Sequence, residues 1–152
     1  METRLVAKIA AAYCLIGMAV ATAILAQMGV LATHYTAGVG IGVVGCIVAA
    51  WLLGRILAPL FLRFPKVLFS AGFGFLLAYG ALIAGGIIGA IATAFTDGLY
   101  QQPDFFSNLF SAVWSLSYLM LVFGASPAAM LGIACGLHIH FALKKTRPVN
   151  AN

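Results

Sequence analysis

The sequence predicts an all-α, polytopic membrane protein with four transmembrane helices in an antiparallel bundle. Three observations support this: four long apolar runs, a composition unlike that of a soluble domain, and basic residues confined to one set of connections. The chain has 152 residues, of which 64% are hydrophobic and 7% are charged. Ordinary soluble domains have about 25% charged residues. We therefore expect residues 1–152 to form a single integral membrane domain.

The apolar runs are long enough to cross a bilayer, since a spanning helix needs about 20 apolar residues. We expect spans at about 9–27, 35–57, 67–95 and 109–143. The first run also resembles the hydrophobic region of a signal peptide, with Ala21-Thr22-Ala23 as a possible cleavage site. It is longer than the roughly 7 to 15 residues usual in such a region. We expect the run to be kept as a span, and cleavage that leaves three spans is the alternative.

The basic residues predict the orientation of the chain. All eight Lys and Arg residues precede the first run, lie close to the connection between the second and third, or follow the fourth: Arg4, Lys8, Arg55, Arg63, Lys66, Lys144, Lys145 and Arg147. The connections on the other side contain only Asp97 and Asp104 as charged residues. Because cytoplasmic loops hold the excess of positive charge, both termini are predicted to be cytoplasmic. A plasma membrane, and most simply a bacterial inner membrane, is the expected location.

Prolines mark two places where we expect the helices to change course. Pro59 and Pro65 flank a basic and aromatic segment, and they are predicted to stop the second helix and form a hairpin with the third. The fourth run would be roughly 50 Å long as one helix, well beyond a hydrocarbon core of about 30 Å. Pro127 lies near its middle and removes one backbone hydrogen bond, so a kink near Pro127 is predicted.

Small residues recur at helical spacing in the second and third runs. The two stripes are Gly38, Gly42, Gly45 and Ala49, and Ala81, Gly85, Gly89 and Thr93. Stripes without side-chain bulk let helices approach closely in lipid. The favoured interpretation is that these two helices pack against each other within the chain. The alternative is a seam for a second copy or a partner, which includes a transport path lined by glycine backbone.

Arg55 is the only charged residue that enters a span. Its long side chain lies about one turn before Pro59, close enough to reach the cytoplasmic surface. We favour this structural interpretation, and a role in binding an anion or gating a substrate is the alternative. The three acidic residues all lie outside the deep parts of the spans. Their absence there weighs against a proton-coupled or cation-coupled transporter.

The remaining reactive residues do not form a known catalytic or metal-binding pattern. His34 is expected at the opposite membrane side from His138 and His140, so two histidines in one chain would not hold a haem. Cys135 and His138 share a helix face, but His140 points roughly 140° away from Cys135. The sequence also lacks the common nucleotide, protease and esterase motifs. We expect no cofactor, no metal and no enzymatic activity.

The function class that fits best is a small non-catalytic membrane protein. We expect it to contact the lipid bilayer and to act through helix-helix contacts, either with a membrane-protein partner or by self-association into an oligomer. The segment from Asp97 to Asp104 and the small-residue stripes are the expected contact surfaces. The alternative is a homo-oligomeric conduit or transporter for a small solute or ion. Nucleic acid is not an expected partner, because the net charge of +5 comes from residues at span ends, where they set topology.

Overall fold

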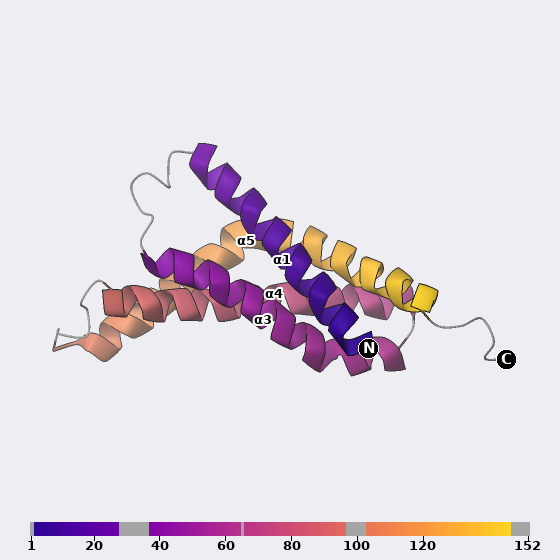
Figure 1. The fold of residues 1–152 in the computed structure, drawn as a ribbon. Coiled ribbons are helices and arrows are strands. Elements are labelled where there is room, and N and C mark those ends of the chain that lie inside the picture. The colour runs from indigo at the N-terminus through magenta and orange to yellow at the C-terminus, as the bar shows by residue number, and fades with distance from the viewer. Residues whose placement is uncertain (1, 28–36, 65, 97–102, 147–152) are drawn as a thin grey trace.

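The computed structural model is all-helical over the residues it describes, which are 2–27, 37–64, 66–96 and 103–146. Its helices are α1 (Glu2–Gln27), α3 (Ala37–Arg63), α4 (Val67–Thr96) and α5 (Phe105–Thr146) (Figure 1). Each contains a stretch that is long and apolar enough to cross a membrane: Glu2–Ala21, Gly40–Arg63, Val67–Thr96 and Ser126–Thr146. The helical class and the multi-pass membrane character predicted from the sequence are therefore confirmed.

The prediction that Pro59 stops the second spanning helix is wrong. Helix α3 passes through Pro59 and ends at Arg63. A proline inside a helix removes one backbone hydrogen bond, but the helix can continue where neighbouring groups hold it. Here Ala58 and Phe61, on either side of the proline, are both buried in the core. Their burial keeps the last turns of α3 against the other helices.

The second proline does mark the end of α3. A residue that precedes proline is disfavoured in the α conformation, and Phe64 occupies that position before Pro65. The Phe64 N–H still donates to the Leu60 carbonyl oxygen at 2.9 Å, which completes the last turn. After this short break the chain enters α4 at Val67.

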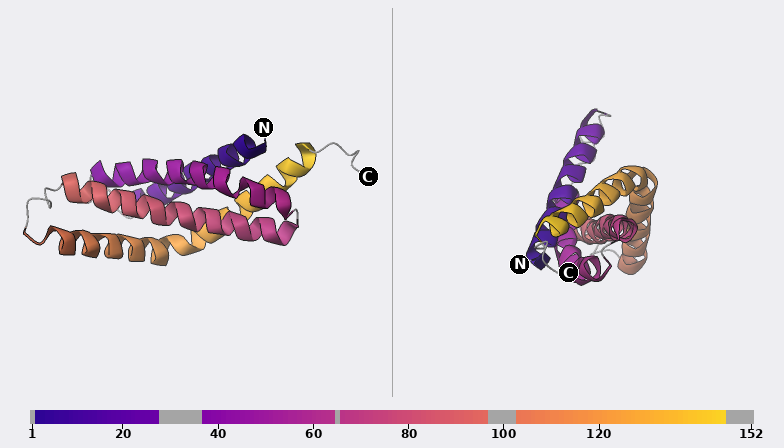
Figure 2. Two further views of the ribbon diagram at one scale, coloured as in Figure 1. Left: turned by 90° about the horizontal axis from the view of Figure 1, so that it is seen from below. Right: turned by 90° about the vertical axis from the view of Figure 1, so that its right-hand side faces the viewer.

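Helix α4 is the centre of the arrangement, with α3 against one part of its surface and α5 against another (Figure 2). Helix α1 crosses α3 and also contacts α5. Its second half then moves away from the other three helices (Figure 1). Gly42, near the start of α3, lies against Gly89 near the end of α4, whereas Phe61, near the end of α3, lies against Phe73 near the start of α4. These two helices therefore run in opposite directions.

The buried core consists of two clusters, the second of which is mostly alanine. One joins α1, α3 and α5 and contains Val6, Ala58, Phe61, Cys135, Ile139 and Leu143. The other joins α1, α3 and α4 and contains Ala10, Ala50, Leu77 and Ala81. Large apolar side chains instead cover much of the outer surface, for example Leu68, which is 81% exposed. This distribution suits a protein whose surroundings are lipid. Apolar side chains on the surface then contact lipid tails, and there is no free-energy cost of exposing them to water.

The basic residues gather at one end of the molecule. The start of α1, the turn between α3 and α4, and the end of α5 lie at that end (Figure 1). The described basic residues in these three places are exposed: Arg4, Lys8, Arg63, Lys66, Lys144 and Lys145. Arg147 lies outside the described residues. The charge pattern along the sequence therefore corresponds to a cationic end in three dimensions.

Reversal of charge in the turn between α3 and α4 tests the orientation. We expect the double variant Arg63→Glu and Lys66→Glu to insert α3 and α4 in the wrong orientation, because positive charge retains a connection in the cytoplasm. A reporter fused in this turn, active on one side of the membrane only, measures the change. The matched control is Arg63→Lys with Lys66→Arg, which keeps both charges. A reporter that stays cytoplasmic in the acidic variant would contradict the topology.

Candidate functional site

The predicted small-residue stripes of α3 and α4 meet each other. A Cβ atom added to Gly42 would lie 3.0 Å from the Gly89 Cα and 3.1 Å from the Gly85 carbonyl oxygen. Gly45 lies against the side chain of Ile88, where an added Cβ would be 3.0 Å from the Ile88 Cδ1. All three distances are tighter than ordinary Cβ contacts. Glycine at these positions therefore lets the two backbones approach closely, and this contact is called the α3–α4 seam below.

The other predicted members of the stripes vary in their placement. Ala81 is buried, and Thr93 is half-buried with its hydroxyl donating to the Gly89 carbonyl oxygen at 2.9 Å. Ala49 is half-buried, whereas its neighbour Ala50 is fully buried in the core. Gly38 is in α3, but its surroundings lie outside the described part of the chain. The row that extends the seam toward the basic end is thus Gly42, Cys46 and Ala50.

Cys46 occupies the space that Gly85 leaves open. A Cβ on Gly85 would overlap the Cys46 sulfur atom, and Cys46 is itself almost fully buried. A thiol behaves here as a small apolar group that fills a gap. All three cysteines of the chain, Cys14, Cys46 and Cys135, are free. Their role in the structure is therefore packing between helices.

A second seam, between α4 and α5, was not anticipated from the sequence. An added Cβ on Gly74 would lie 2.7 Å from the Gly136 Cα and would overlap the Gly132 carbonyl oxygen. Gly132 in turn faces Ala78, and Gly136 faces the backbone of Ser70. The signal that could have found this contact is present in the sequence, since Gly132 and Gly136 form a small-xxx-small pair. The partner row on α4 also repeats at four residues: Ser70, Gly74 and Ala78.

A third close contact attaches α1 to α3 near the basic end. A Cβ on Gly54 would lie 3.0 Å from the Ala7 Cα and 3.0 Å from the Ala10 Cβ. Farther along α1, an added Cβ on Gly17 would lie 3.0 Å from the Leu131 Cδ1 of α5. The first helix is therefore held by small residues over its first turns and by a longer side chain beyond them.

Two histidines of α5 link this helix to two of its neighbours. The Tyr13 hydroxyl of α1 lies 3.2 Å from His138 Nδ1, and the two rings meet edge to face with centroids 5.7 Å apart. The Ser70 hydroxyl of α4 lies 3.4 Å from His140 Nδ1. The two histidines thus reach different helices. His34 lies outside the described residues.

The positions of Cys135 and the histidines do not favour a shared metal site. Cys135 is buried in the core beside Ile139, whereas His138 is exposed and His140 is half-buried. Within the described ranges, no three His, Cys, Asp or Glu residues come together as a metal-binding group. The arrangement of these side chains is therefore that of interhelical contacts.

Arg55 is exposed on α3, and its guanidinium lies 4.8 Å from the centroid of the Trp51 ring. Arg63 lies in a similar way over Phe64, at 5.8 Å. A cation over an aromatic face is attracted by the ring quadrupole. Each arginine therefore lies against an aromatic ring of its own segment.

Comparison of the chain with protein-family models, with curated proteins and with solved structures finds no match.

The α4–α5 seam can be tested with two glycines on the same helix. Gly74→Leu is expected to push α4 and α5 apart and to lower the free energy of unfolding by about 1–3 kcal/mol or more. Gly72→Leu is the matched control, because nothing lies within 4 Å of a Cβ added there. The unfolding midpoint in mild detergent measures the difference. Equal midpoints for the two variants would refute close packing at Gly74.

The hydroxyl-histidine contacts should make small contributions to stability. Tyr13→Phe and Ser70→Ala each remove one hydroxyl and should each cost about 0.6 kcal/mol, which is the average for polar contacts between membrane helices. The same unfolding measurement applies, with Ser107→Ala as the control because Ser107 is exposed. If both variants matched the control, these contacts would have no part in joining the helices.

Proposed function

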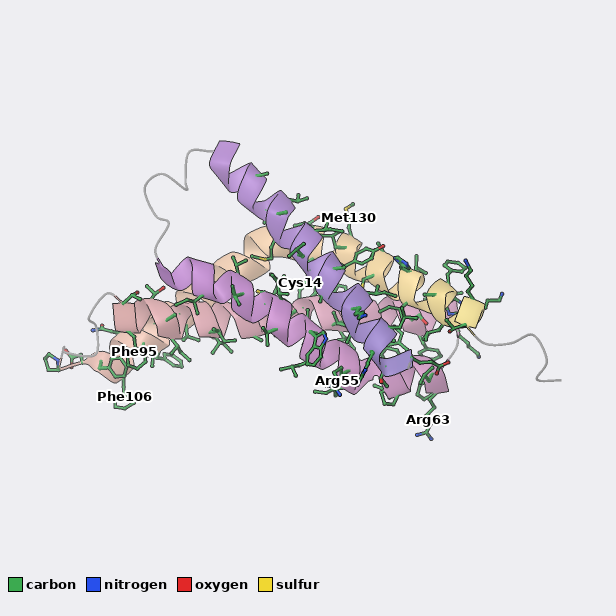
Figure 3. The ribbon with its side chains drawn as sticks, in the orientation of Figure 1. Cys14, Arg55, Arg63, Phe95, Phe106 and Met130 are labelled. Carbon is green, nitrogen blue, oxygen red and sulfur yellow. The ribbon has the colours of Figure 1, made fainter. Side chains whose placement is uncertain are left out.

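We propose that this protein is a non-catalytic, multi-pass subunit of a membrane assembly, and that the outer half of α1 contacts its partner. The observation that carries the proposal is the exposure of this segment. Leu15, Ile16 and Val20 are 56%, 50% and 46% exposed. Beyond the contact of Gly17 with Leu131, the helix leaves the rest of the protein (Figure 3). A spanning helix with few neighbours in its own chain has a face available for another protein.

The composition of this face supports a protein partner. Ala12, Ala19 and Ala23 are exposed together with the larger residues. Alanines on a lipid-facing helix allow a second helix to approach closely, and dispersion between the two then stabilises the contact. Many small residues of the three other helices are instead used inside the chain, in the seams described above.

The same seams weigh against the conduit alternative. A path lined by the glycines of α3 and α4 would require those glycines to face an opening. Instead Gly42 lies against Gly85 and Gly89. We therefore favour partner binding over solute passage.

For the arrangement in the membrane, we propose an antiparallel bundle with the basic end in the cytoplasm, in a plasma membrane of bacterial type. The common end of the basic residues supports this. We also propose that α5 bends at Pro127. Helix α5 has 42 residues and would be about 63 Å long if straight, about twice a typical hydrocarbon core. Figure 2 shows that the helix changes direction along its length, and Pro127 lies inside it.

Photo-crosslinking tests the partner surface. A photoreactive amino acid at Ile16 or Val20 in native membranes is expected to give one adduct of defined mass, either with a second copy or with a different protein. The control position is Leu68 on α4, which is exposed but belongs to another face. The same species should co-purify in mild detergent at a fixed stoichiometry and should be lost when Ala19→Trp disrupts the face.

Two results would contradict this function. Lipid adducts alone at Ile16 and Val20, as at Leu68, would leave the outer half of α1 without a protein partner. Solute flux through the purified protein in liposomes would favour the conduit instead.

A further inference from the structure

The crossing of α1 and α3 places several cations on one side of the two helices. Gly54 of α3 contacts Ala7 and Ala10 of α1. Lys8 follows Ala7, and Arg55 follows Gly54, so each side chain turns about 100° away from the contact. Helix α1 begins at the end of the molecule where α3 finishes, so the two helices run in opposite directions (Figure 1). For two antiparallel helices, a rotation of about 100° from the contact on each helix places Lys8 and Arg55 on the same side of the crossing.

Two further residues belong to the same side. Arg4 precedes Lys8 by one turn of α1, and Trp51 precedes Arg55 by one turn of α3. All four side chains are exposed, and the Arg55 guanidinium lies against the Trp51 ring. Figure 3 shows Arg55 on the outer side of α3, close to the point where α1 crosses it. These four residues, Arg4, Lys8, Trp51 and Arg55, are called the cationic corner below.

In the part of the chain that the structure describes, no acidic residue lies beside the cationic corner to balance it. Among the described acidic residues, Asp104 precedes α5 at the opposite end of the molecule. Glu2 is on α1, but it lies about 200° around the helix from Arg4 and so projects to the other side. Arg55 also lies eight residues before Arg63, about 12 Å along the helix from the end of α3. A cation at that depth is stabilised by an anion that can reach it.

An apolar strip continues from the cationic corner into the membrane. Val48 and Val44 lie on the same side of α3 as Arg55, at seven and eleven residues before it. They are 51% and 60% exposed. An exposed apolar surface would thus lie next to a phosphate group bound at the cationic corner, in the direction of the start of α3. Tryptophan is typical of the boundary between headgroups and acyl chains, and Trp51 is the residue between Arg55 and this strip.

We propose that the cationic corner binds one anionic phospholipid from the leaflet at the basic end, with its phosphate between Lys8, Arg4 and Arg55 and one acyl chain along Val48 and Val44. A soluble anion lacks the acyl chain that the apolar strip accommodates. An acidic partner protein would have no need of that strip. The site is independent of the outer half of α1, so its test does not depend on the proposed partner.

The tryptophans allow a direct measurement. The chain has two tryptophans, so Trp114→Phe leaves Trp51 as the only tryptophan, whose emission can be excited separately from that of tyrosine. Phospholipids with brominated acyl chains quench a nearby tryptophan. In the full-length Trp114→Phe protein, reconstituted in mixed bilayers, brominated phosphatidylglycerol should quench Trp51 more strongly than brominated phosphatidylcholine at equal mole fraction. The quenching ratio gives the relative binding constant.

Charge removal at the corner should abolish this preference. We expect Lys8→Gln and Arg55→Gln to lower the preference for phosphatidylglycerol by about fivefold for each removed cation. Lys144→Gln with Lys145→Gln removes the same charge from the end of α5 and should leave the preference unchanged. Lys8→Arg with Arg55→Lys should retain it. Unfolding midpoints in phosphatidylcholine bilayers verify that each variant is folded.

Three outcomes would overturn the proposal. The first is equal quenching by the two brominated lipids. The second is an equal loss of preference in the Lys8 and Arg55 variant and in the Lys144 and Lys145 variant, which would indicate a general charge effect. The third is displacement of phosphatidylglycerol by millimolar inorganic phosphate, which would identify a site for free phosphate. Single Arg55→Gln keeps the test available if the double variant fails to fold.

Discussion

Helix association in this protein depends on how closely backbones can approach, because lipid tails are as apolar as the helices that cross them. Burial of large side chains in such surroundings gives little drive for association, whereas dispersion at short range does. The α3–α4 seam at Gly42, Gly85 and Gly89 and the α4–α5 seam at Gly74, Gly132 and Gly136 both follow from this constraint. The same constraint explains why many alanines are fully buried while large apolar side chains cover much of the surface.

Much of the fold could be predicted from the sequence, because length and hydropathy determine which segments can cross a bilayer. The stripes on α3 and α4 could also be predicted, since their five glycines at helical spacing are a strong local pattern. The α4–α5 seam was less visible, because its α4 row combines a serine, a glycine and an alanine, and only its α5 row contains two glycines. Which helix each row contacts depends on the tertiary structure, and it cannot be predicted from the spacing of residues along one helix.

Pro59 shows where local reasoning fails. A proline weakens a helix by one hydrogen bond, which is a local effect, but the continuation of α3 depends on Ala58 and Phe61, whose burial involves α1 and α5. The cationic corner has a similar origin. Arg55 could be recognised as an unusual charge within a span, but its association with Lys8 depends on the contact between Gly54 and Ala7. Neither result follows from one segment taken alone.

The central position of α4 also has a consequence for biosynthesis. Ribosomes synthesise a chain from its amino end. Helices α1 and α3 therefore leave the ribosome before α4, which both glycine seams require. Among the close contacts of the described residues, that of Gly54 with Ala7 and Ala10 is the first that can form. Once α4 is inserted, it can form the α3–α4 seam. The row of Ser70, Gly74 and Ala78 on α4 then stays without its partner until α5 is synthesised. A nascent chain stalled before Gly132 would therefore present an unsatisfied surface to the insertion machinery and to quality-control proteases.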